Sequence, residues 1–151
     1  MLRSHLLLNT IKKQRFVYIF STMILFWAIF DGIMTYSVPI VITGQGYSDT
    51  MMGIIYASSS VVGAIFDFVI SKLFKNTNYR RMFILMFIFS LIYPLLLWEA
   101  KSLYMFFIAM AVWGMYWDFH GFGVFDFLSR YVKKSENTQD FGILNIFHSI
   151  G

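Results

Sequence analysis

Four long apolar segments set the strongest limit on what this chain can fold into. They cover residues 16–42, 51–74, 82–98 and 103–131, and short polar stretches separate them. A helix rises about 1.5 Å per residue, so about 20 residues cross the roughly 30 Å hydrocarbon core of a bilayer. All four segments lie within or above the usual range of spanning lengths. The sequence therefore predicts an all-α, polytopic transmembrane helical bundle.

Composition agrees with a lipid environment and argues against a soluble enzyme. Hydrophobic residues make up 58% of the chain and charged residues only 13%, which leaves too few polar side chains to cover a soluble domain. The sequence contains no cysteine and none of the motifs HExxH, GxSxG or GxxxxGK. We therefore expect no enzymatic activity, no cofactor and no metal site.

A fifth apolar run covers residues 141–151, where the sequence stops. Its 11 residues would rise only about 16 Å, too little to cross a bilayer. We therefore interpret the chain as an N-terminal fragment whose partners include the missing C-terminal part of the same protein. Residues 1–15 are expected to form a cytoplasmic N-terminal segment, and residues 16–151 a transmembrane domain with the start of a fifth helix.

Basic residues predict the orientation of the bundle, because Lys and Arg accumulate in short cytoplasmic loops. Of the 12 basic residues, 11 lie before the first segment, from the end of the second segment up to the third, or from the end of the fourth segment onward. Only Lys101 lies in a connection on the other side. We therefore expect a cytoplasmic N-terminus in a protein of the cell membrane. The same asymmetry explains the positive net charge without nucleic-acid binding.

Ionisable residues inside the segments are candidate functional groups, because charge is costly in lipid. Asp31 lies in the first segment and Asp118 and His120 in the fourth, and these are the candidates for substrate binding or proton coupling. Each has a structural alternative as a buried, hydrogen-bonded residue, which for His120 is the favoured interpretation. Asp118 and His120 point about 200° apart on a helix, which argues against a shared metal ion. Asp126 and Arg130 have the i, i+4 spacing of a helix-end ion pair.

The second segment differs from the others because small residues recur along it. They are Gly53, Ala57, Ser58, Ser59, Ser60, Gly63 and Ala64. Small residues at such spacing let a neighbouring membrane helix approach closely. We interpret this segment as a packing helix, and the alternative is that its serines contact substrate.

Two motifs give the chain a resemblance to the major facilitator superfamily of secondary transporters. Gly63-Ala-Ile-Phe-Asp67 resembles the GxxxD that opens the family signature, and Arg80-Arg81 resembles the basic pair that introduces the third helix. Phe68 stands where the family has a basic residue. The resemblance implies that these four motif residues take part in gating, that the first and fourth helices line a central cavity, and that the third is peripheral. It also implies that the chain is part of a six-helix N-terminal half.

Two functions remain open at this stage. The first is secondary active transport of an unidentified small solute by alternating access, coupled to protons. The alternative is a non-transporting membrane scaffold or assembly subunit, in which close helix packing is the main role.

Overall fold

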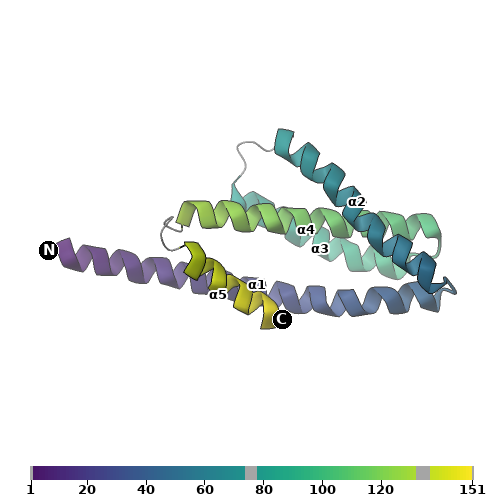
Figure 1. Ribbon diagram of the computed structural model, residues 1–151, viewed down its shortest axis with the longest axis horizontal. Coiled ribbons are helices and arrows are strands. Elements are labelled where there is room, and N and C mark those ends of the chain that lie inside the picture. Colours follow the sequence, from purple (N-terminus) through teal and green to yellow (C-terminus); the bar gives the residue numbers. More distant parts are fainter. Residues whose placement is uncertain (1, 74–77, 132–136, 151) are drawn as a thin grey trace. The chain divides into compact units, whose positions relative to one another are not determined.

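The computed structural model describes residues 2–73, 78–131 and 137–150, and the side chains of residues 15–72, 78–131 and 142–150. Every regular element in these ranges is a helix (Figure 1). The helices are α1 (Leu2–Gly44), α2 (Asp49–Leu73), α3 (Tyr79–Glu99), α4 (Leu103–Tyr131) and α5 (Asn137–Ile150). The predicted all-α class is confirmed.

Helix boundaries follow the predicted segments closely, apart from the two ends of the chain. α4 begins and ends at the predicted residues, and α2 and α3 differ from prediction by one to three residues at each end. α1 begins at Leu2, so the segment expected before residue 16 continues the helix. Residues 2–15 contain no Gly or Pro, which explains why nothing in them interrupts the helix. α5 begins four residues before the predicted start.

Three of the described helices are long and apolar enough to cross a membrane. They are Arg15–Gly44, Asp49–Lys72 and Tyr79–Glu99. α4, with 29 residues, has sufficient length but is not among these three. The fourth predicted span is a helix of spanning length that carries the candidate residues Asp118 and His120.

The chain divides into two compact units, which are described separately. The first contains Met1–Thr35 and Leu128–Gly151, and the second contains Tyr36–Phe127. Within the first unit, α5 lies alongside α1 (Figure 1). The rings of Phe16 and Tyr131 are 6.0 Å apart, and those of Trp27 and His148 are 5.8 Å apart. Aromatic contacts thus join α1 to the end of α4 and to α5 within this unit.

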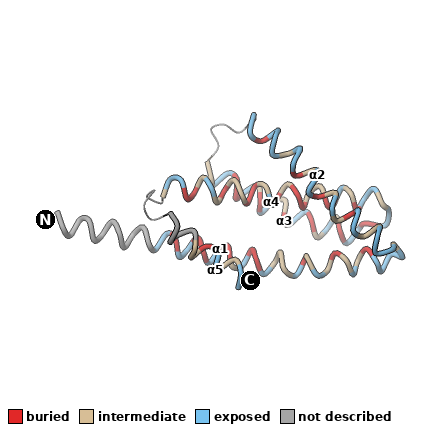
Figure 2. Tube along the Cα trace, in the orientation of Figure 1, coloured by how far each residue is buried: buried red, intermediate tan, exposed pale blue. Residues whose placement is uncertain are grey.

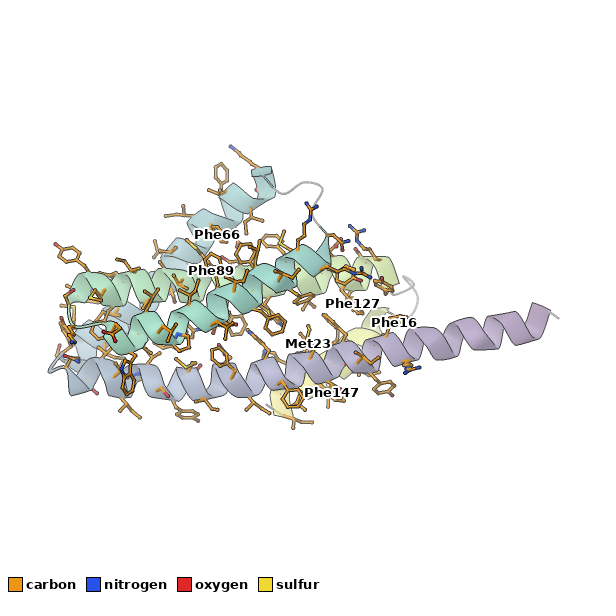
Figure 3. All side chains as sticks on the ribbon, turned by 180° about the vertical axis from the view of Figure 1, so that it is seen from behind. Phe16, Met23, Phe66, Phe89, Phe127 and Phe147 are labelled. Carbon is orange, nitrogen blue, oxygen red and sulfur yellow. The ribbon has the colours of Figure 1, made fainter. Side chains whose placement is uncertain are left out.

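The core of the second unit lies where α2, α3 and α4 meet. One face of α3 is buried at intervals of three or four residues, as expected for a helix that packs on one side (Figure 2). The ring of Phe119 on α4 lies 5.2 Å from Phe66 of α2 and 5.4 Å from Phe89 of α3 (Figure 3). Ser90 and Tyr93 are on the buried face of α3, so its outer face is almost entirely apolar. A peripheral position for α3 stays a prediction that this pattern supports.

Side chains satisfy the backbone where α2 and α3 begin. The hydroxyl of Ser48 accepts a hydrogen bond from the backbone N–H of Met51 at 3.3 Å. Asn78 caps α3 by accepting from the N–H of Arg80. In the turn before α2, Gly46 has φ 86°, a left-handed conformation that glycine adopts without steric cost.

Candidate functional site

Asp118 lies at the contact between α4 and α2, next to the predicted gating motif. A Cβ placed on Gly63 would lie 3.3 Å from Oδ2 of Asp118, so the glycine leaves the space that this carboxyl group fills. That oxygen is buried and has no hydrogen-bond partner among the described residues. Asp67, one turn after Gly63, is close enough for the two carboxylates to repel each other when both are ionised. The structure thus brings together one coupling candidate and two motif residues.

Small residues allow this close approach of α2 and α4. A Cβ on Gly114 would lie only 2.5 Å from the carbonyl oxygen of Ser59, so the two backbones are in direct contact there. The hydroxyls of Ser58 and Ser59 donate to backbone carbonyls of their own helix, at 2.6 and 2.7 Å. These contacts support the packing interpretation of α2 around Ser59 and Gly63. By contrast, Gly53 has open space around it.

His120 is in a different environment from Asp118. Its side chain is buried, and its ring makes an edge-to-face contact with Trp117 at 6.0 Å. Its burial fits a structural role. The interpretation of His120 as a hydrogen-bonded buried histidine stays a prediction. Within the described part of the chain, no three His, Cys, Asp or Glu side chains gather as metal ligands would.

Asp31 lies in the first unit, in the middle of the apolar part of α1. Its side chain is half-buried, one helical turn after the buried Trp27. α5 places His148 against Trp27, with 5.8 Å between ring centroids and 38° between ring planes. The sequence alone did not single out His148 as a candidate site residue. Its contact with Trp27 depends on how α5 pairs with α1.

The basic pair of the predicted gating motif, Arg80 and Arg81, lies at the start of α3. Nε of Arg80 donates to the hydroxyl of Tyr79 at 3.1 Å. Nζ of Lys72 lies 4.1 Å from the ring centroid of Phe68, a cation–π contact. Phe68 stands where the family signature has a basic residue, and its ring contacts the ammonium group of Lys72, one turn further along α2. Gating by Asp67, Arg80 and Arg81 stays a prediction.

Asp126 joins the end of α4 to the start of α3. Its Oδ2 accepts a hydrogen bond of 2.7 Å from the backbone N–H of Tyr79. A carboxylate at a helix N-terminus satisfies a free N–H group and interacts favourably with the helix dipole. The predicted ion pair of Asp126 with Arg130 stays a prediction.

Comparison with known protein families matches residues 2–151 to the Major Facilitator Superfamily. No curated protein and no solved structure matches the chain. The family match covers nearly the whole chain and agrees with the all-α fold and the three helices of spanning length and apolarity. The chain therefore belongs to the major facilitator superfamily of secondary transporters and is an integral membrane protein.

Proposed function

We propose that this chain belongs to a proton-coupled secondary transporter that moves a small solute by alternating access. The observation that carries the proposal is Asp31, a half-buried carboxyl group near the middle of the spanning part of α1, Arg15–Gly44. Ionisable residues at such depth are rare in membrane helices, and they mark ion pathways and proton relays. Family membership makes transport the general activity. Proton coupling and the choice of Asp31 are our proposals.

The surroundings of Asp31 on its own helix favour a proton as its neutraliser. Its i−4 and i+4 neighbours are Trp27 and Thr35, an apolar wall and a weak hydrogen-bonding group. No Lys or Arg occurs in α1 beyond Arg15. An ionised carboxylate there is costly, so binding a proton lowers the cost of carrying the group through the transport cycle.

Asp31→Asn tests this proposal, because asparagine is nearly isosteric and stays neutral. Labelled solutes from a panel are first screened for uptake into proteoliposomes that contain the complete protein and a pH-sensitive dye. With an imposed pH gradient, we expect Asp31→Asn to abolish accumulation against a gradient while exchange at equal concentrations persists. Glu99→Gln, at the end of α3, is the control and keeps accumulation. Undiminished gradient-driven uptake by the Asn variant would refute proton coupling through Asp31.

We also propose that the N-terminus faces the cytoplasm, on the basis of the basic-residue asymmetry. Single cysteines replace Ser48, in the turn before α2, and Lys133, which lies outside the described residues. A membrane-impermeant thiol reagent should label the first but not the second in intact cells. Labelling at position 133 alone would reverse the orientation.

A further inference from the structure

The register between α1 and α5 places a half-buried histidine beside the middle of the apolar part of α1. Tyr131, at the end of α4, contacts Phe16, and His148 contacts Trp27 eleven residues further along α1. Eleven residues of helix rise about 16 Å. His148 therefore lies about half a bilayer away from the level at which α1 enters the apolar region.

Asp31 and His148 lie near the same stretch of α1. Asp31 follows Trp27 by one turn, and helical side chains lean toward the N-terminus, so its carboxyl group points back over the turn that carries Trp27. His148 stands against the ring of Trp27. The same indole thus neighbours an acid on its own helix and an imidazole on the next.

Other titratable groups in this unit lie far from the level of Asp31. Among its described side chains they are Arg15, Tyr18, Arg130 and Tyr131. Arg15 and Tyr18 precede Asp31 by 16 and 13 residues of helix, about 24 and 20 Å. Tyr131, with Arg130 before it in the chain, packs on Phe16 near the level of Arg15. Within the described side chains of the first unit, Asp31 and His148 are the acid and the base of its middle section.

We propose that His148 is the second proton-carrying residue of the Asp31 site, which rests on the proposed function above. With one proton on the pair, either Asp31 is protonated and the imidazole neutral, or the carboxylate faces an imidazolium. When the Asp31 carboxyl group loses its proton, a ring nitrogen of His148 takes it, so the pair keeps zero net charge in both forms. This avoids an isolated charge in an apolar region.

The ring of Trp27 lies within cation–π range of the His148 ring. The face of an indole attracts a cation within about 6 Å of its centroid. The two rings are 5.8 Å apart and tilted by 38°, which lies within that range. Histidine is also the residue type whose ordinary titration lies between pH 5 and 8. Trp27 is thus a positioning residue for His148 and a spectroscopic reporter of its protonation.

Tryptophan fluorescence of the complete protein in detergent tests the pair without a known solute, because an imidazolium quenches an adjacent indole more than a neutral imidazole does. On acidification from pH 8 to pH 5, we expect a fall in emission that both His148→Gln and Trp27→Phe remove. Asp31→Asn should displace the pH at which the emission falls, since the variant removes the proposed partner of His148. Arg15→Gln, about 18 Å from Trp27 along α1, is the control. It should leave the dependence of emission on pH unchanged.

Two results overturn the inference. One is an unchanged acid-induced fall in both His148→Gln and Trp27→Phe, and the other is no displacement of that fall in Asp31→Asn. Trp27→Phe removes the indole from the same contact. If His148→Gln fails to fold, Trp27→Phe therefore still tests the inference. In proteoliposomes we further expect His148→Gln to reduce gradient-driven uptake at least tenfold. Gradient-driven uptake by Asp31→Asn, with the fluorescence results as expected, would refute the proposed function and leave the proposed pairing of Asp31 with His148 standing.

Discussion

The two units hold polar residues in an apolar bundle by different means. In the second unit, backbone meets backbone at Gly114 and Ser59, and the Asp118 carboxyl group fills the space above Gly63. In the first unit aromatic rings meet, at Phe16 with Tyr131 and at Trp27 with His148. The one glycine of α5, Gly142, has nothing within 4 Å of an added Cβ.

This difference shows which kind of change each unit tolerates. A backbone contact cannot absorb an added methyl group unless the helices separate, whereas a ring contact adjusts by rotation about side-chain bonds. The second unit is therefore a rigid frame for Asp118. The first unit leaves room for its acid and its histidine to change charge.

The largest effect is expected at the tightest backbone contact. Gly114→Ala places a carbon 2.5 Å from the carbonyl oxygen of Ser59, so α2 and α4 must move apart. We expect a loss of about 1–3 kcal/mol in the free energy of unfolding, the usual cost of overpacking. Denaturant unfolding in detergent micelles measures it.

Gly142→Ala and Gly121→Ala are the matched controls, since neither Cβ would meet an atom within 4 Å. Both should keep or slightly raise stability, because alanine favours a helix more than glycine does. A loss at Gly142 equal to that at Gly114 would remove the contrast between the units.

A smaller effect is expected where a side chain can yield. A Cβ on Gly123 would lie 2.8 Å from the ring tip of Phe83, which can turn, unlike a backbone carbonyl. Gly123→Ala should cost about 1 kcal/mol in the same unfolding assay. Gly123→Ala combined with Phe83→Leu should restore part of that loss. If Gly123→Ala lowered the free energy of unfolding more than Gly114→Ala does, the rigidity of the α2–α4 contact would not explain the order of the two losses.

Periodicity and polarity predicted the helices and part of the site. Apolar length determined α2, α3 and α4 to within three residues, because lipid leaves the backbone few alternatives to a helix. The spacing of small residues indicated a close contact along α2, which Ser59 and Gly63 make with α4. These are properties of one helix at a time, and they can be read along the chain.

Contacts between distant segments could not be predicted in this way. The hydrogen bond from the Tyr79 N–H to Asp126 joins residues 47 apart in sequence, whereas i, i+4 spacing suggested only Arg130 as a partner. The contact of His148 with Trp27 depends on how α5 is aligned beside α1. Hydropathy has a period but carries no information about which helices pair, so these two contacts required the structure.

A third prediction concerns the start of α3. Asn78→Ala removes the side chain that accepts from the Arg80 N–H, and capping residues contribute about 1 kcal/mol. The Asp126 carboxylate still accepts from Tyr79, so we expect a loss of about 0.5–1 kcal/mol. Hydrogen exchange of the first amides of α3 measures it. Asn78→Ala together with Asp126→Ala should free both amides, and equal protection in the single and double variants would contradict this account.

The smallest effect, and the one of opposite sign, is expected at the acid pair of the second unit. Asp67 and Asp118 repel each other when both are ionised, and the buried Oδ2 of Asp118 has no hydrogen-bond partner among the described residues to offset this. Asp67→Asn removes one charge and keeps the shape of the side chain. The side chain of Asp67 is exposed, so solvent screens the repulsion between the two carboxylates. We therefore expect Asp67→Asn to raise the free energy of unfolding at neutral pH by less than about 1 kcal/mol.

A double-mutant cycle separates this repulsion from any other effect of the substitution, because the two residues act on each other only through charge if the account is right. Asp67→Asn should stabilise the protein by about 0.5 kcal/mol when Asp118 is present, and should have no effect when Asp118 is already Asn. Added salt should shrink the first value, since exposed charges are screened within about 10 Å at 0.1 M. An equal gain in both backgrounds would mean that Asp67 destabilises α2 by itself. In that case the α2–α4 contact would position Asp118 without electrostatic repulsion from Asp67.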